Sequence, residues 1–394
     1  MLNLMKLHAV NRSTLFLFGC LLYFGGSAIL NSDTSPILII RFLQLTGLSF
    51  IFYNFFFLVK KQNSRLTSFC VCFFVILGVF IMIRGNYLTV MSVLNKVYDR
   101  MGLMLYLTPL IYFILSENVL KKMFSLFFLM SLLFVVLILL SYRALFTEFG
   151  FVVISQLTAF LGSTSIILFY FIRSFGLKYK IVIFISLGLL FIFATLMARR
   201  GLVLDIFIAF FLNIVGVVIF GDNNSKQKIK ILFFIFFLSL IAWRGYGYLS
   251  TTLFSNLIEK GMTDTRSQVE FMFIDDVFSN VSDVFWGRGI DGVYYAPGIE
   301  SSGEEYRNLI ETGFLHIILK GGILFLIPFL VFLICAICKG FASKSYFSHQ
   351  SALFLVHFIV SLYPGSPFAF CPKYLFVWVA VWSIYTNQKN NIFR

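Results

Sequence analysis

The chain has little charge: only 12% of its 394 residues are Asp, Glu, Lys or Arg, whereas 60% are hydrophobic and the mean hydropathy is +0.93. A soluble fold of this length needs more polar surface than these residues supply. Acidic residues are especially scarce, with 17 against 31 basic ones. In so apolar a chain, the net charge of +14 fits loops that face anionic lipid headgroups. The composition therefore predicts a membrane protein and argues against nucleic-acid binding.

Signatures of metal, redox and hydrolase chemistry are also missing. The six cysteines lie mostly in apolar runs, and Cys335 and Cys338 form a CxxC without a second Cys or His pair. This pattern supports neither a disulfide framework nor a zinc site. There is no HExxH, GxSxG or P-loop, and Asp275-Asp276 lacks the spacing of the aspartates that hold a metal in soluble sugar-nucleotide transferases. We therefore expect no metal ion and no other cofactor.

Long apolar runs recur along the whole sequence. About 20 such residues cross ~30 Å of hydrocarbon as a helix, and the alternation expected of barrel strands is missing. We therefore expect an all-α polytopic membrane protein with about twelve transmembrane helices, the first of them uncleaved. The expected spans are 13–31, 36–59, 67–83, 101–116, 122–142, 150–172, 181–198, 202–220, 230–246, 309–338, 349–364 and 372–387. No internal repeat of the kind common in transporters is present.

Basic residues predict the topology. With the N-terminus inside, seventeen basic residues lie on the inner side, and thirteen of these are lysine, as the positive-inside rule requires. Both termini are then cytoplasmic. The fourteen basic residues on the outer side include ten arginines. These are Arg41, Arg84, Arg100, Arg143, Arg199, Arg200, Arg244, Arg266, Arg288 and Arg307.

The outer arginines allow two interpretations. A guanidinium is a permanently charged fork that can grip phosphate or carboxylate with two hydrogen bonds. The alternative for each one is headgroup anchoring or an ion pair within the protein.

One long hydrophilic segment, 247–308, separates a membrane domain of residues 1–246 from a second one of residues 309–394. In the expected topology this segment is a large periplasmic loop. Eleven of the 17 acidic residues lie between Glu259 and Glu311, mixed with aromatic residues that include Trp286 and Tyr306. Aromatic faces and carboxylates together are typical of carbohydrate sites, although any soluble loop is also rich in acids.

A pair of arginines occurs at the outer junction of two expected spans, in Ala198-Arg199-Arg200-Gly201. The N-terminus of a helix, two guanidinium groups and a glycine that admits a close ligand together predict an anion site. Adjacent residues on a helix diverge by about 100°, so we expect one arginine to face the site and the other to face a headgroup or partner. Asp205, one turn deeper, should pair with a cation from another helix.

A second candidate lies in Phe285-Trp286-Gly287-Arg288-Gly289-Ile290-Asp291-Gly292. Glycines around an arginine indicate a tight turn or a ligand that passes close to the backbone. The alternative is that Arg288 braces the loop through Asp291 or another acid.

The third candidate spans residues 303–322, which enter an expected span from outside. If this segment is helical throughout, Arg307 and Glu311 are i,i+4 partners, and His316 shares a face with Thr312, Gly313 and Lys320. A lone histidine is usually a satisfied core residue. A histidine near a lysine and the outer side is also a candidate for proton transfer.

The order of these pieces resembles the bacterial O-antigen polymerase (Wzy) family, within the group that includes O-antigen ligases. The matching features are the frame of many spans, Arg-Arg-Gly at 199–201, Trp-Gly-Arg-Gly at 286–289, Glu-Thr-Gly-Phe-Leu-His at 311–316 and Lys-Gly-Gly at 320–322. The motifs are short, and the spans cover nearly the whole chain.

The resemblance implies a metal-independent glycosyltransferase of the C-type fold at the periplasmic face of the bacterial inner membrane. It would transfer the growing glycan from undecaprenyl diphosphate to the non-reducing end of a new lipid-linked repeat unit, for lipopolysaccharide biosynthesis. Its expected partners are the lipid-linked oligosaccharide, membrane lipids, a chain-length regulator and a flippase.

Under this interpretation, the site residues fall into two groups. His316 or Glu311 would orient or deprotonate the acceptor hydroxyl, and Arg200 would help to neutralise the leaving diphosphate. The expected substrate-binding residues are Arg199, Arg288, Arg307, Arg244, Arg84 and Tyr306. The alternatives are an O-antigen ligase, which uses the same donor, and a flippase for lipid-linked oligosaccharides.

Overall fold

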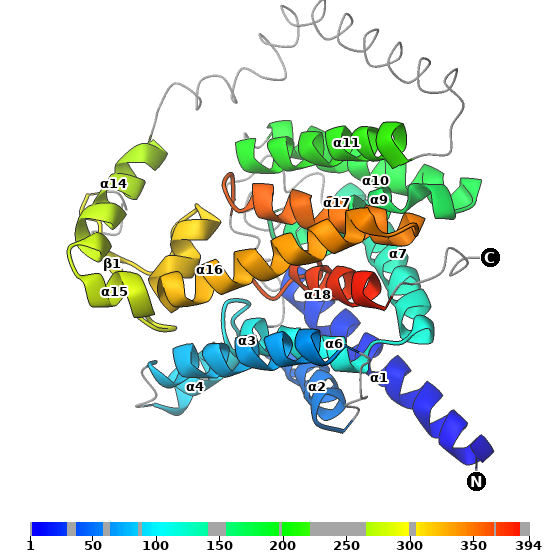
Figure 1. Cartoon of the computed structure of the whole chain (residues 1–394), viewed down its shortest axis with the longest axis horizontal. Coiled ribbons are helices and arrows are strands. Elements are labelled where there is room, and N and C mark those ends of the chain that lie inside the picture. The colour runs from blue at the N-terminus through cyan, green and yellow to red at the C-terminus, as the bar shows by residue number, and fades with distance from the viewer. Residues whose placement is uncertain are drawn as a thin grey trace, which may run out of the picture.

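The computed structural model describes residues 2–29, 37–57, 64–85, 89–140, 155–196, 199–220, 265–298, 305–365 and 368–386 (Figure 1). The expected span 230–246 and the arginines Arg143 and Arg244 lie outside these residues. Within them the chain is predominantly helical. Its two short strands, β1 (Tyr294–Tyr295) and β2 (Tyr306–Arg307), pair antiparallel.

The helices follow the apolar runs. In chain order they are α1 (Leu2–Ile29), α2 (Ile37–Phe57), α3 (Arg65–Ile83), α4 (Val90–Tyr98), α5 (Leu103–Leu107), η1 (Thr108–Leu110), α6 (Ile111–Ile114), α7 (Glu117–Leu140), η3 (Thr158–Gly162), α9 (Ser163–Tyr170), η4 (Ile172–Ser174), α10 (Leu177–Leu196), α11 (Arg200–Phe220), α14 (Thr265–Phe278), α15 (Val281–Trp286), α16 (Gly313–Ala342), α17 (Tyr346–Ser361) and α18 (Pro372–Tyr385).

Six of the described helices are long and apolar enough to cross a membrane. They are Ile37–Phe55, Arg65–Ile83, Glu117–Leu140, Leu177–Leu196, Arg200–Phe220 and Gly313–Ala342. The prediction of an all-α, multi-pass membrane protein is therefore confirmed. Two further apolar helical stretches, Thr14–Ile29 and Leu103–Ile114, are shorter.

The expected span 101–116 is not a continuous helix. It consists of α5, η1 and α6, and Pro109 lies at the start of η1, where it cannot donate a backbone hydrogen bond. Even as a regular helix, the apolar segment Leu103–Ile114 would extend only about 18 Å, because each residue adds about 1.5 Å. The structure therefore gives a shorter, interrupted helix in this segment, and its crossing of the bilayer stays a prediction.

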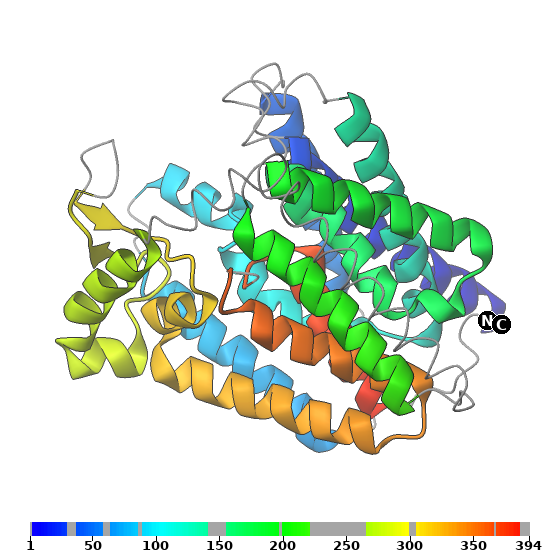
Figure 2. The same cartoon turned by 90° about the horizontal axis from the view of Figure 1, so that it is seen from above.

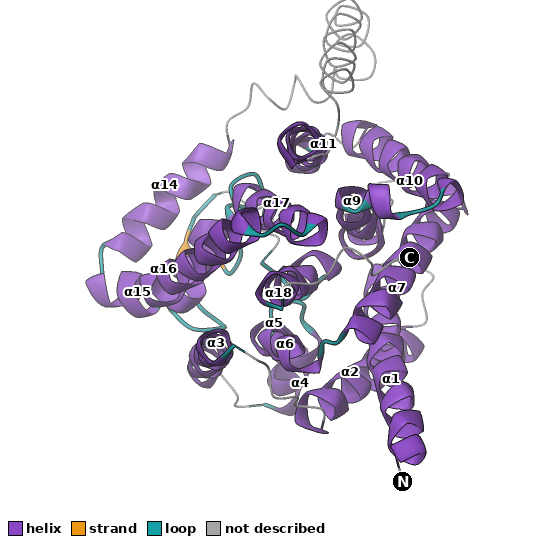
Figure 3. Cartoon of the chain, turned by 45° about the vertical axis from the view of Figure 1, so that its right-hand side comes forward, coloured by secondary structure: helices purple, strands orange, loops and turns teal. Residues whose placement is uncertain are grey.

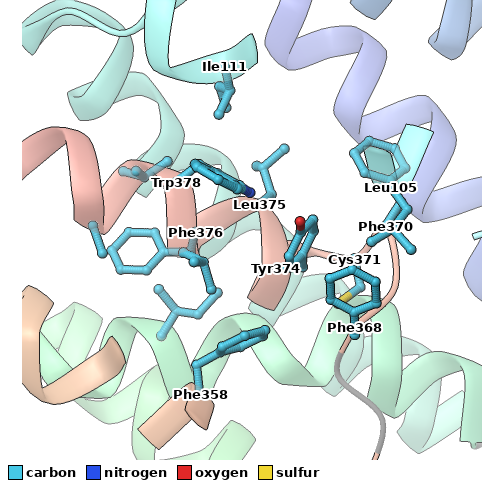
Figure 4. Packing of buried hydrophobic residues seen from close by; sticks show 14 of the residues in the cluster. Leu105, Ile111, Phe358, Phe368, Phe370, Cys371, Tyr374, Leu375, Phe376 and Trp378 are labelled. Carbon is cyan, nitrogen blue, oxygen red and sulfur yellow. The ribbon is translucent and has the colours of Figure 1, made fainter. Parts of the chain in front are cut away.

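Helix α18 forms the centre of the bundle. Viewed nearly along the helices, it lies inside a ring that includes α16, α17, α9, α7, α6 and α3 (Figure 3). Every residue from Pro372 to Ile384 is buried. Trp378 packs its indole against the rings of Phe74 and Phe332, each with 5.9 Å between ring centroids, and Tyr374 lies near Phe358 and Phe368 (Figure 4). Because lipid tails are as apolar as these side chains, the hydrophobic effect does not drive helices together within a membrane. The close packing of aromatic rings holds α18 in position instead.

Hydrogen bonds to backbone carbonyls bring several helix ends together at one end of the bundle. The Phe370 N–H, just before α18, donates to the Arg100 carbonyl (2.6 Å), and the Gly313 N–H of α16 donates to the Leu362 carbonyl after α17 (2.7 Å). The Tyr23 hydroxyl of α1 donates to the Tyr98 carbonyl of α4 (3.0 Å). Helices α14 and α15 lie at this end, whereas α1 begins and α18 ends at the opposite one (Figure 2).

The two ends carry different cations. The first end, named the arginine-rich end here, carries Arg41, Arg84, Arg100, Arg199, Arg200, Arg266, Arg288 and Arg307. At the opposite end Lys122 donates to Thr14 (2.8 Å), and Lys339 lies 4.2 Å from the centroid of the Tyr385 ring. Lys121, Lys178, Lys180 and Lys344 belong to the same end. Arginine therefore predominates at one end of the described bundle, although Lys96, Lys320 and Lys373 also lie there, and lysine predominates at the other, named the lysine-rich end here.

The long helix α16 is kinked, and the loop after α15 docks onto the kink. Gly322 has a φ of 66° and a ψ of −174°, which interrupts the helix. A helix broken there cannot supply the usual N–H partners for the carbonyls of Leu319 and Lys320. The Arg288 and Gly289 N–H groups donate to these carbonyls instead, at 2.6 and 3.0 Å.

Two glycines make this contact between backbones possible. A Cβ on Gly287 would lie 2.5 Å from the Lys320 carbonyl oxygen, and a Cβ on Gly322 would lie 2.2 Å from the Phe285 carbonyl oxygen. Both glycines have a positive φ, of 70° and 66°, which a side chain disfavours. The loop glycine Gly287 thus admits the backbone of α16, where the sequence suggested a turn or a ligand.

Substitution of Gly322 by Ala should destabilise the protein. The positive φ alone costs roughly 1–3 kcal/mol for a residue with a side chain, and the clash with Phe285 adds to it. The midpoint of thermal unfolding in detergent should fall measurably. Gly188→Ala is the matched control, because this helical glycine of α10 has no atom within 4 Å of an added Cβ. Equal midpoints for the two variants would refute the contact.

Candidate functional site

The candidate site lies around His316, at the start of α16. Thr312 is the N-cap of this helix, and the His316 N–H donates to the Thr312 carbonyl (2.9 Å). The His316 side chain is only 1% exposed. Its Nδ1 has no hydrogen-bond partner within the described part of the chain. Lys320, one turn further along α16, and Arg100 are the charged groups that act on it.

Arg100 follows α4 and was not among the predicted site residues. Its backbone carbonyl holds the Phe370 N–H (2.6 Å), which fixes it against the start of α18. Its guanidinium forms no hydrogen bond or ion pair with any residue that the structure describes. It is close enough to interact electrostatically with both His316 and Arg199. Within the described part of the chain, Arg100 therefore brings a cation without an ion-pair partner close to the predicted histidine.

Arg199 and Glu311 join the same group. Partial burial lowers the pKa of the Arg199 guanidinium, the Glu311 carboxylate raises it, Arg100 lowers it further, and the net shift is downward. Arg199 is half-buried, whereas its neighbour Arg200, the first residue of α11, is exposed. The two arginines thus face different surroundings, as their adjacent positions predicted.

Gly201 does not leave room for a ligand. A Cβ at this position would lie 2.4 Å from the Pro364 carbonyl oxygen, in the turn that follows α17. The glycine therefore lets the start of α11 pack against that turn. The Pro364 backbone thus occupies the space beside Gly201 on this side, and the approach of a phosphate to the helix start stays a prediction.

Arg288 braces its loop. Its Nε donates to Asp283 (2.8 Å), Nη1 donates to Asp276 (2.5 Å) and to the Val293 carbonyl (2.7 Å), and Nη2 donates to two oxygens of Asp276 (3.2 and 3.3 Å). All five N–H groups of the guanidinium therefore have acceptors within the protein. In this structure Arg288 therefore stabilises its own loop through Asp276 and Asp283, which was the alternative to ligand binding. Asp291 pairs with Lys96 instead (2.6 Å).

A network of side chains ties α14 to the start of α16. The Arg266 guanidinium donates to the Thr312 hydroxyl (2.9 Å), to Glu270 (3.2 Å) and to the Tyr363 carbonyl, and the Thr312 hydroxyl donates to Glu270. Thr312 is also the residue whose carbonyl accepts the His316 N–H. The first helix of the described loop thereby restrains the helix end that carries the histidine.

The other predicted residues lie apart from this group. Tyr306 is exposed and packs edge-on against Tyr295 across the strand pair, with 5.5 Å between ring centroids. Arg84 is exposed, follows α3, and donates from Nη1 to the Trp286 carbonyl (2.8 Å).

The predicted i,i+4 pair of Arg307 and Glu311 is wrong. Arg307 belongs to β2 and is paired with Tyr294, so residues 307–311 are not helical. The helix begins only at Gly313, because the backbone of Thr312 is extended and caps it.

A second cluster of charge is buried between α11, α17 and α18. The Lys373 ammonium donates to both carboxylate oxygens of Asp205 (2.5 and 2.6 Å), which confirms the expected cation partner from another helix. His357 Nε2 also lies 2.7 Å from Asp205, and its Nδ1 lies 2.7 Å from the Tyr170 hydroxyl. If Asp205 is ionised, His357 donates from Nε2, so the Tyr170 hydroxyl donates to Nδ1. Every one of these polar groups is then satisfied.

Sequence analysis missed Lys373 and His357 as partners of Asp205. Each is an isolated ionisable residue in an otherwise apolar run, which is itself a signal that a partner exists within the membrane. Which helices adjoin could not be known from that signal. Among the described residues, no three His, Cys, Asp or Glu side chains are placed to share a metal ion.

No family model, curated protein or solved structure matches this chain.

Substitution of Lys373 by Met should be strongly destabilising. It leaves the Asp205 carboxylate buried without its cation, which costs roughly 3–5 kcal/mol in other proteins. The free energy of unfolding in detergent measures the loss. Adding Asp205→Asn should recover much of it, because the uncompensated charge is removed. A double variant no more stable than Lys373→Met alone would contradict this account of the cluster.

Because of the Asp276–Arg288 contact, the free energy of unfolding should depend on pH in the acidic range. Partial burial alone would raise the pKa of the Asp276 carboxyl, but hydrogen bonds from Arg288 and the Tyr295 N–H, with the Arg288 charge, lower it below its ordinary 3.8. The ionised group therefore stabilises the fold above pH 3.8, and this contribution is lost as the pH falls through the lowered value. Unfolding should be measured against pH for the wild type and Asp276→Asn. The wild type should be more stable by roughly 1–3 kcal/mol near neutrality and lose that advantage in acid; a difference that is constant with pH would contradict the assignment.

Proposed function

We propose that the chain is a glycosyltransferase that moves a glycan from a lipid-linked diphosphate donor to the hydroxyl of an acceptor sugar. One observation carries the proposal: a buried histidine whose Nδ1 has no hydrogen-bond partner among the described residues interacts with Arg100, a cation that forms no ion pair with any of them, at the arginine-rich end. A buried polar group without a partner in the protein is costly, and such groups are retained where a ligand supplies the partner.

The cations suit a diphosphate leaving group. Arg100 and Arg199 lie close enough to repel each other, and two such guanidinium groups are stabilised by an anion between them. Charge that develops on the departing diphosphate is stabilised most by donors already in place. The proposal therefore assigns the diphosphate to Arg100 and Arg199, while Arg200, at the exposed start of α11, remains a predicted contact.

His316 and Glu311 supply the candidates for the base. In the proposed reaction the acceptor hydroxyl gives its proton to one of them, and its oxygen attacks the anomeric carbon of the donor. The bond between that carbon and the diphosphate oxygen breaks, and the diphosphate leaves with the electron pair. His316 is the better candidate, because its Nδ1 is uncommitted and Glu311 is exposed and faces Arg199.

The resemblance of the sequence to O-antigen polymerases supplies the substrates of this proposal. The donor is then a growing glycan on undecaprenyl diphosphate, and the acceptor is a new lipid-linked repeat unit. The arginine-rich end faces the periplasm and both termini face the cytoplasm, in an inner membrane crossed about twelve times. The positive-inside rule, which counts lysine and arginine together, supports this orientation through the excess of seventeen basic residues inside over fourteen outside.

Removal of His316 or Arg100 should abolish polymer formation. In vesicles that contain the purified protein and a lipid-linked repeat unit, His316→Gln should slow polymerisation roughly 10²–10⁴-fold and Arg100→Met roughly 10²–10³-fold. His349→Gln and Arg65→Met change the same residue types at the lysine-rich end and should leave the rate unaltered. Wild-type rates for His316→Gln and Arg100→Met, in protein with a normal unfolding midpoint, would refute the site.

Two further comparisons sharpen the result. Arg199→Met should reduce the rate more than Arg200→Met, because only Arg199 is half-buried near Arg100 and Glu311. In cells that lack the protein, single repeat units should still reach lipid A-core. Polymer that accumulates on the lipid carrier would instead indicate a ligase.

A further inference from the structure

Helix α15 carries apolar side chains that the described residues leave exposed. Val281 is 81% exposed, Phe285 46% and Trp286 42%, and Val281 and Phe285 are one turn apart on the same face. These residues lie in the hydrophilic segment that was expected to stand in water. Exposed aromatic residues of this size in a loop need a partner.

The depth of Trp286 is set by contacts with α3. Its ring packs against Phe80, with 5.7 Å between centroids, and the Ile290 N–H four residues later donates to the Ile81 carbonyl (3.2 Å). Phe80 and Ile81 belong to the last turns of α3, which is long and apolar enough to cross a membrane. Trp286 therefore lies level with the end of a membrane-spanning helix.

The apolar face of α15 continues the lipid-facing surface of α3. Ile76, Phe80 and Ile83 are exposed along α3, and Trp286 extends that strip onto α15. Viewed nearly along the bundle, α15 lies at the rim, outside the ring of helices around α18 (Figure 3). The apolar face of α15 lies at this rim, level with the end of α3. It is therefore placed to contact lipid and not the centre of the protein.

Arg84 lies at the level where a lipid headgroup is expected. Arg84 directly follows α3, is exposed, and lies 5.8 Å from the centroid of the Phe80 ring. Of its five N–H groups, one donates to the Trp286 carbonyl within the described structure. Aromatic residues with an arginine beside them are typical of the boundary between hydrocarbon and headgroups.

We propose that Phe285 and Trp286 of α15, with Phe80 and Arg84 of α3, form a membrane anchor that inserts into the phospholipid leaflet at the arginine-rich end. The occupant of the exposed face is the bilayer itself, with acyl chains against the rings and headgroup phosphate against Arg84. The anchor holds α15 at the membrane surface while the following residues dock onto α16. The inference stands independently of the proposed transferase activity.

Tryptophan quenching in vesicles tests the anchor. One variant keeps Trp286 as its only tryptophan, with Trp243, Trp378 and Trp382 replaced by Phe. The matched control keeps only Trp378, which is 0% exposed in the core. Phosphatidylcholine brominated on the acyl chain near the headgroup should reduce Trp286 emission by roughly half or more and leave Trp378 emission nearly unchanged.

Iodide in the aqueous phase gives the opposing measurement. Efficient quenching of Trp286 by iodide, with no effect of brominated lipid, would overturn the anchor and leave the face open to water or to a protein or sugar. If the substituted proteins do not fold, the difference in emission between the wild type and Trp286→Phe, in brominated and in ordinary lipid, isolates the same signal. A difference that is insensitive to bromine would equally overturn the proposal.

Discussion

Two backbone hydrogen bonds, from Arg288 and Gly289 to the carbonyls of Leu319 and Lys320, join the loop after α15 to the kinked helix α16. Within a membrane, carbonyls freed by a kink cost several kcal/mol each unless another group satisfies them. The loop amides do this, so the kink and the loop conformation depend on each other. Because the part of α16 before the kink carries His316 and Lys320, the position of the candidate site depends on this contact.

The surrounding side chains stabilise the loop in the shape that this contact requires. Arg288 uses all of its donors on Asp276, Asp283 and the Val293 carbonyl, while the Lys320 ammonium reaches the Gly292 carbonyl (2.8 Å). Charge in the protein thus has distinct uses. Arg288 and the Asp205–Lys373 pair are satisfied internally and hold elements together. Within the residues that the structure describes, the Arg100 guanidinium and His316 Nδ1 instead have no hydrogen-bond partner. That contrast separates the candidate site from the other charged clusters.

Local chemistry was predictable from the sequence, and pairings between distant elements were not. Apolar run length predicted the membrane helices, and the cost of a charge in lipid predicted that Asp205 has a cation partner. The identity of that partner, Lys373, depends on which helices adjoin. Likewise, the glycines around Arg288 predicted a close approach, but only the fold shows that α16 is what approaches. Arg100 was overlooked as a site residue because its importance comes from α18 packing beside it, far away in the sequence.

Hydrogen exchange read at single residues tests the contact between loop and kink most directly. The amides of Arg288 and Gly289 should exchange roughly two orders of magnitude more slowly than that of Gly298, an exposed residue of the same segment, because they donate to carbonyls of a membrane helix. Exchange of all three at similar rates would contradict the account, because the loop would then not be held on α16.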